Sequence, residues 1–170
     1  AALAAMRDTW AAAGRPAGDL SAVAFALGCV LAPGEAADGD RAMAQSGPRA
    51  AVLLHRAADE ALSGLPNTSA IPDAVAAEVA AYVETAKAFE PADARYLENH
   101  RGHLMAVMPN ERRFVTAELI RRTTMTGAEA DLLDRIAALR DAGYTQFAIQ
   151  LTPGNEAAIE DWGRIKAKMG

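Results

Sequence analysis

The stretch "RDAGYTQFAIQLTPGNEAAIEDW", residues 140–162, decides the fold class. Gly143 is typical of the left-handed residue that ends a helix. The segment "YTQFAIQLTP" alternates polar and apolar residues and then becomes apolar, which predicts a strand. The residues after it begin with acids and end with lysines, which predicts a helix whose charges match its macrodipole. The stretch therefore predicts one helix–strand–helix unit of an α/β protein.

Two more strands are predicted upstream of this unit. The apolar run "LSAVAFALGCVLAP", residues 20–33, has the length and composition of a strand buried on both faces. The segment "TTMTG", residues 123–127, predicts a short strand. The letters "TGAE" then match a capping box, in which Thr126 caps a helix and Glu129 reaches back. Helices between strands imply parallel βα units joined by crossover connections.

The remaining chain is mostly helical in pattern. Helical periodicity occupies residues 1–13 and 35–62, and the second stretch is expected to break near 46–49, where Pro48 can open a new helix. Residues 63–118 are predicted to form a long helical excursion between the first two strands.

The whole chain, residues 1–170, is interpreted as a single domain. Three parallel strands with this many helices make a poor closed fold, but they fit part of a (β/α)8 barrel or of a larger open sheet. The last strand of such a barrel needs a first strand beside it, and the chain offers no such strand. The chain also opens without a Met, in what reads as the middle of a helix, which favours a fragment.

Composition excludes several classes of protein. The chain has 51% hydrophobic residues and a net charge of −5, which predicts a globular protein and disfavours nucleic acid as the main partner. The single cysteine, Cys29, lies in an apolar run and is interpreted as a buried, inert thiol in a reducing, cytoplasmic setting. No apolar run approaches the roughly 18 residues that a membrane-spanning helix needs.

No sharp catalytic or metal-binding motif is present. The patterns GxGxxG, GxxxxGK, HExxH and GxSxG are all absent. The three histidines are spread along the chain, and Arg101 lies between His100 and His103, so no metal site is predicted. No residue is assigned as catalytic. None of the strand ends carries the Lys or Glu that a barrel aldolase or isomerase would use.

The tail "TTMTGAEADLLDRIAALRDAGYTQFAIQLTPGNEAAIEDWGRI" resembles the C-terminal end of the bacterial luciferase-like family of flavin- and deazaflavin-dependent oxidoreductases. The piece "ENHRGHLMAVMPNERRFVTAELI" resembles the variable region before it, as in members similar to methylenetetrahydromethanopterin reductase. The piece "AAMRDTWAAAGRPAGDLSAVAFALGCVLAPGEAADGDRA" resembles the preceding helix–strand–helix unit. The likeness covers nearly all 170 residues, as a pattern rather than a sharp motif.

This resemblance implies the C-terminal part of a luciferase-like (β/α)8 TIM barrel, with about its last three strands. It implies an oxidoreductase or monooxygenase that binds FMN or a deazaflavin coenzyme and acts on a small organic substrate, the cofactor supplying the chemistry. The segment alone is expected to be inactive and to need a missing N-terminal half or a homo-oligomer. The alternative is a catalytically silent half-barrel, or a truncated fragment, that acts only as an assembly partner.

In a barrel the active site lies at the carboxyl ends of the strands, so the candidate cofactor residues are the polar residues at these ends. Thr124, Thr126 and Gln150 are predicted to hydrogen-bond the polar edge of a cofactor ring. Gly127, at a helix start, leaves backbone N–H groups that suit an anion. The alternative is that Thr126 only caps its helix and Gln150 only covers the end of the barrel.

The excursion supplies the predicted substrate residues. Residues 99–107, "NHRGHLMAV", precede the second strand from the end, where a barrel insertion often lies over the pocket. Arg101 and His103 are predicted to bind an anionic or carbonyl substrate there. The alternative is a surface loop with solvated charges.

Overall fold

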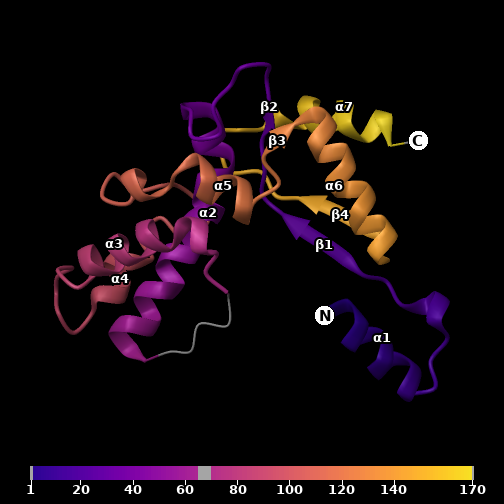
Figure 1. The fold of residues 1–170 in the computed structure, drawn as a ribbon, viewed down its shortest axis with the longest axis horizontal. Helices are drawn as coiled ribbons and strands as arrows, with labels where there is room; N and C mark the ends of the chain where they lie inside the picture. The colour runs from indigo at the N-terminus through magenta and orange to yellow at the C-terminus, as the bar shows by residue number, and fades with distance from the viewer. Residues whose placement is uncertain (1, 65–69, 170) are drawn as a thin grey trace.

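The apolar and alternating segments form a small parallel sheet. In the computed structural model, which describes residues 2–64 and 70–169, the strands are β1 (Val23–Ala26), β2 (Val30–Leu31), β3 (Gly127–Ala128) and β4 (Gln146–Ile149). β1 pairs with β4 and β2 pairs with β3, both in parallel (Figure 1). The prediction of a mixed α/β protein with a parallel sheet is confirmed.

The first predicted strand is divided into β1 and β2, yet its backbone keeps pairing through the break. Met125 N–H donates to the Leu27 carbonyl at 2.9 Å, and Gly127 N–H donates to the Cys29 carbonyl at 3.2 Å. The last strand, β4, pairs with β1 from Val23↔Gln146 onward, rather than with the strand that precedes it along the chain. The predicted last strand thus pairs with the first of the three predicted strands, while the second, β3, pairs with β2.

Seven α-helices are described, joined by single turns of 3-10 helix at Ala17–Asp19, Asp73–Val75 and Arg112–Phe114. They are α1 (Ala2–Ala12), α2 (Asp40–Ser63), α3 (Ala76–Ala86), α4 (Arg95–Asn99), α5 (Ala117–Thr123), α6 (Glu129–Ala142) and α7 (Ala158–Lys168). None of these described helices is long and apolar enough to cross a membrane. Part of the predicted excursion, residues 65–69, lies outside the described residues.

Two apolar cores hold the elements together. The predicted excursion folds back onto α2, where Leu54, Val79, Tyr82, Leu119 and Ile120 form one buried cluster. The second cluster lies between the sheet and α6 and α7, and it contains Val30, Met125, Leu132, Ile136 and Ile165. Figure 1 shows α2, α3 and α4 gathered on one side and β4, α6 and α7 on the other, with α5 between them.

Pro48 does not open a second helix, as the sequence suggested, but lies inside the continuous helix α2. Proline lacks the N–H that would bond the carbonyl four residues back, which is that of Ala44. The Thr152 hydroxyl, from the loop after β4, donates to this carbonyl at 2.8 Å. A long-range hydrogen bond therefore replaces the helical one and links the sheet to α2.

This replacement predicts a coupling between Thr152 and Pro48. Thr152→Val should lower the free energy of unfolding by about 1–2 kcal/mol, because the Ala44 carbonyl and the Asn155 amide lose their partner. In a Pro48→Ala background the helix supplies its own N–H to Ala44, so the cost should fall by about 1 kcal/mol. Urea unfolding of the four proteins in this cycle measures the coupling, with Thr152→Ser as the control that keeps the hydroxyl. Equal costs in both backgrounds would contradict it.

The helix after β3 begins differently from the predicted capping box. α6 starts at Glu129 with Ala128 as its N-cap, and no side chain caps it. The Thr126 hydroxyl instead accepts from the Cys29 N–H at 3.2 Å, because Thr126 is buried against the central strand. The predicted helix stop is confirmed, since Gly143 has a φ of 98°.

Cys29 is fully buried, as the sequence predicted. Burial raises the pKa of its thiol to about 11, with Arg41 opposing and Glu35 and Asp161 adding to the rise. Because the thiolate is the reactive form, the sulfur is inert at neutral pH.

Candidate functional site

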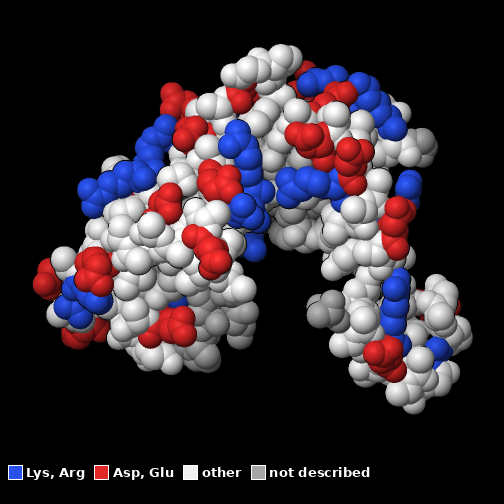
Figure 2. Space-filling model, in the orientation of Figure 1, with Lys and Arg blue, Asp and Glu red and all other residues white. Residues whose placement is uncertain are grey.

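An open groove of about 1360 Å³ lies at the carboxyl ends of β2 and β3. Its walls come from the loop after β2, the first half of α6, one residue each of α2 and α5, and two residues of α7. They include Leu31, Pro33, Arg41, Arg121, Thr126, Gly127, Arg135 and Arg164. Figure 2 shows basic and acidic side chains interspersed over the face of the molecule that it presents. The groove occupies the end of the parallel strands where α/β proteins bind ligands.

The side chain of Arg41 forms hydrogen bonds that join different parts of the groove's wall. Its guanidinium donates to Glu35, to Asp161 at 3.0 Å and to the Val30 carbonyl at 2.8 Å. The hydrogen bonds from Arg41 lower the pKa of the Glu35 carboxyl, and the same bonds raise the pKa of Arg41. This network joins α2, the loop after β2 and α7.

The other groove arginines differ in how much of their charge is compensated. Arg135 donates to the Thr124 carbonyl at 2.7 Å and to the Thr126 carbonyl at 3.4 Å. Arg164 pairs with Asp161 at 2.5 Å. The exposed side chain of Arg121 makes no hydrogen bond or ion pair with residues 2–64 or 70–169. Arg121 therefore offers the groove a guanidinium that has no ion-pair partner among these residues.

Three of the four predicted cofactor residues come together. Thr124 and Thr126 are buried, and their hydroxyls lie 2.8 Å apart, while the Thr124 hydroxyl also donates to the Ile120 carbonyl at 2.6 Å. Gly127 follows them and lines the groove with Thr126. Gln150 is not among the lining residues, and its backbone N–H continues the β1–β4 pairing through the Ala26 carbonyl at 2.8 Å.

The predicted substrate residues lie elsewhere. Arg101 and His103 belong to the turn after α4, which packs on α2, and neither lines the groove. Arg101 is exposed and pairs with Glu98 at 3.2 Å, as expected of a solvated surface charge. His103 instead joins the two other histidines of the chain.

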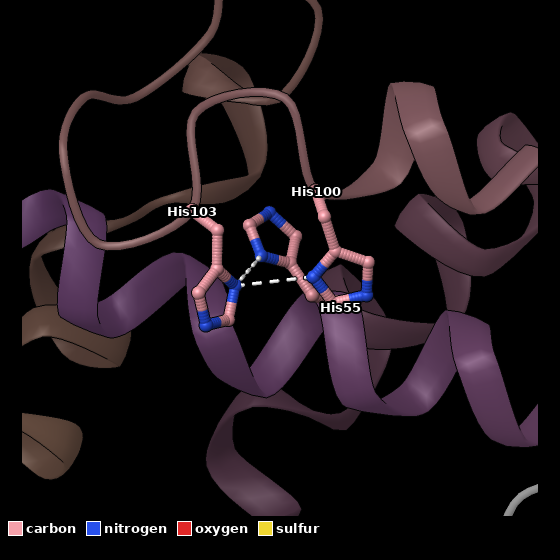
Figure 3. Close-up of side chains that lie close together, drawn as sticks. All are labelled: His55, His100 and His103. Carbon is pink, nitrogen blue, oxygen red and sulfur yellow. Dashed lines mark hydrogen bonds between the residues drawn. The ribbon is translucent and has the colours of Figure 1, made fainter.

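The three histidine rings converge on one point (Figure 3). The Nδ1 atom of His103 lies 3.2 Å from Nδ1 of His55, on α2, and 3.1 Å from Nδ1 of His100. One ligand atom from each ring lies within 4.8 Å of the other two. His55 is buried, and His100 and His103 are partly exposed. Residues 48 positions apart in sequence thus form one cluster.

Two carboxylates hold the far sides of the rings. Nε2 of His55 lies 2.7 Å from Glu111, whose other oxygen accepts the Met108 N–H at 2.7 Å. Nε2 of His100 lies 2.9 Å from Asp59, which sits one helical turn after His55. Each of these two rings therefore has its Nε2 on a carboxylate and its Nδ1 toward the cluster.

The buried amide of Asn99 holds the Asp59 carboxylate in place beside His100. Asn99 donates to Asp59 at 2.8 Å and to the His55 carbonyl at 3.1 Å, and it accepts from the Tyr82 hydroxyl at 2.8 Å. Burial, with the nearby acids, raises the pKa of Tyr82, so the phenol keeps its proton as a donor. The amide is thereby fixed with its nitrogen toward the carboxylate.

The sequence reasoning missed His55, Asp59, Asn99 and Glu111. One signal was available, because His55 and Asp59 are four apart and share a face of a strongly helical segment. Their approach to residues 99–111 is a tertiary contact between α2 and the excursion, which no local pattern reveals.

The chain matches no protein-family model, no curated protein and no solved structure. The geometry described above therefore carries the functional conclusions.

Proposed function

We propose that the chain is part of a luciferase-like oxidoreductase or monooxygenase that uses FMN or a deazaflavin coenzyme and acts on a small organic substrate. In this proposal the chain supplies the C-terminal strands of a (β/α)8 barrel. The resemblance in sequence and the parallel βα units support it. The bound cofactor would supply the hydride or oxygen chemistry, and the chain would bind and orient it.

The observation that carries the proposal is the Arg121 guanidinium, which has no ion-pair partner among the described residues, in a groove at the strand ends. The first turn of α6 lines the same groove, and the side chain of its N-cap residue does not bond the free N–H groups there. A phosphate group on a cofactor tail suits both features. Four carboxylates also line the groove: Glu35, Glu129, Asp131 and Asp161. Glu35 and Asp161 bond Arg41, and Glu129 bonds Lys168. Asp131 is therefore the main opposing charge for an anion held by Arg121.

An exposed apolar face supports the part of the proposal that concerns assembly. Val23 and Phe25 are two apart on β1, so they share one face of the strand, and their exposed fractions are 48% and 66%. Large apolar side chains on a strand favour covering by other protein. Further barrel strands, or a second copy of the chain, would cover them. The alternative function, a catalytically silent assembly partner, would bury the same face of β1 but would bind no cofactor in the groove.

Cofactor titration tests the proposal. FMN and a deazaflavin are each added to the protein, and quenching of cofactor fluorescence is followed. We expect saturable binding of one of them, weakened about tenfold or more by Arg121→Gln, because a charge-assisted phosphate contact is lost. Arg122→Gln is the matched control, since Arg122 is the exposed neighbour that bonds Glu118 and does not line the groove.

The outcomes separate the two functions. Equal binding by the Arg121→Gln and Arg122→Gln proteins would show that the cofactor does not use this groove. Absence of binding for both cofactors would overturn the proposal that this chain itself holds the cofactor, and it would favour the assembly partner.

A further inference from the structure

We propose that His55, His100 and His103 bind one divalent transition metal ion of the zinc class through their Nδ1 atoms. The chain contains three histidines in 170 residues, and all three meet at this point. Imidazole nitrogen is the common ligand for zinc, copper, nickel and cobalt, and three histidines with one open position form a known type of zinc coordination. The site is separate from the groove and does not depend on the proposed cofactor.

The proton positions favour a cation over a set of hydrogen bonds. An ionised carboxylate only accepts, so the Nε2 atoms of His55 and His100 carry the protons that face Glu111 and Asp59. With the ring proton on Nε2, each Nδ1 carries a lone pair, and both lone pairs point at Nδ1 of His103. One N–H on His103 can satisfy only one of them well. A metal ion accepts all three lone pairs at once.

The third ring can also turn a lone pair toward the ion. Nε2 of His103 makes no hydrogen bond with the described residues, so it is free to carry the ring proton. Nδ1 then presents its lone pair to the ion, which is the form of histidine that binds metal.

The distances suit a tetrahedral ion. Zinc–nitrogen bonds of 2.0–2.1 Å in a tetrahedral site place ligand nitrogens about 3.3 Å apart. The separations from His103 Nδ1 are 3.2 Å and 3.1 Å, and all three ligand atoms lie within 4.8 Å of one another. Two of the three edges therefore already match, and admitting the ion requires only that the His55 and His100 rings turn toward a common point. The partly exposed rings of His100 and His103 leave a path for the ion and for a water molecule as fourth ligand.

The surroundings match those of metal sites. Carboxylates that accept from the outer nitrogen of a ligating histidine orient the ring and increase its basicity, and Glu111 and Asp59 occupy these positions. Their two negative charges would balance the two positive charges of the ion. With the ion bound, the buried carboxylate of Glu111 would lie near a positive charge on the far side of His55.

The turn that presents His100 and His103 is held in an unusual shape. Leu104, directly after His103, has a φ of 60°, which is strained for a bulky side chain. Gly102, between the two histidines, packs so closely that a Cβ there would lie 3.0 Å from Met108 Cγ and closer still to the Ala106 carbonyl oxygen. The close packing fixes both rings toward His55.

Metal titration tests the inference on protein purified without a histidine tag. Zinc is added in competition with a chromophoric chelator, and cobalt is added in parallel. We expect one zinc per chain with micromolar or tighter affinity, and intense visible cobalt bands typical of four-coordinate geometry. His103→Ala should weaken zinc binding at least 100-fold and should abolish the cobalt bands. The circular dichroism spectrum should be unchanged, because His103 is partly exposed.

A second variant keeps all three rings. In Glu111→Gln the Met108 N–H holds the amide oxygen, so the amide nitrogen donates to Nε2 of His55 and moves the ring proton to Nδ1. Loss of this lone pair should weaken zinc binding about 10–100-fold. Arg101→Ala, beside the site but not a ligand, should stay within about threefold of the original protein. Unchanged affinity in His103→Ala, or no stoichiometric zinc binding at all, would overturn the inference.

Discussion

Replacing Gly28 with alanine is expected to destabilise the protein by about 3 kcal/mol or more. The N–H of Met125 donates to the Leu27 carbonyl at 2.9 Å, and the N–H of Gly127 donates to the Cys29 carbonyl at 3.2 Å, so two backbone hydrogen bonds flank Gly28. A Cβ at Gly28 would lie 2.5 Å from the carbonyl carbon of Met125 and 2.9 Å from its Cβ. The atoms in the way are mostly backbone atoms of Met125, which cannot rotate aside as a side chain can. Residues 27–29 and 125–127 must therefore move apart, which breaks the hydrogen bonds between them.

Urea unfolding followed by circular dichroism measures this loss. The matched control is Gly163→Ala in α7, where a Cβ would meet no atom within 4 Å. That change should stabilise the protein by about 0.8–1 kcal/mol, because alanine is the better helix former. If the Gly28→Ala protein is as stable as the original, the two segments do not approach each other as closely as described.

Periodicity predicted the elements well where local forces decide them. The strand at residues 144–153 and the helices on either side appear as β4, α6 and α7, because alternation, a glycine stop and charged helix ends are local features. Pro48 was misread for the opposite reason. Its helix continues because Thr152, more than 100 residues away, bonds the carbonyl that the proline leaves open.

Tertiary contacts also explain what the sequence could not reveal about the sites. The pattern at Thr126 matched a helix cap, but burial beside Cys29 gave its hydroxyl another partner. His100 and His103 looked like a poor metal pair because the third ring, His55, lies 45 residues before the first of them. Only the packing of residues 99–111 on α2 brings the three together with their carboxylates.

Glu111→Ala is expected to lower the free energy of unfolding by about 3 kcal/mol, even without metal. The carboxylate side chain is 3% exposed, and it accepts from His55 at 2.7 Å and from the Met108 N–H at 2.7 Å. Alanine leaves two donors without an acceptor, and one of them belongs to a side chain that is 1% exposed. Water cannot replace the lost acceptor at His55 without entering the core beside α2.

The measurement is urea unfolding in the presence of EDTA, so that a bound ion adds nothing to the stability. Glu84→Ala is the matched control, because Glu84 is 70% exposed and its one ion pair with the described residues is to Lys87. Its loss should cost less than about 0.5 kcal/mol. Adding His55→Leu to Glu111→Ala should recover part of the loss, since the imidazole donor is then gone as well. If instead the two glutamate variants are equally stable, Glu111 is not the buried acceptor that holds His55.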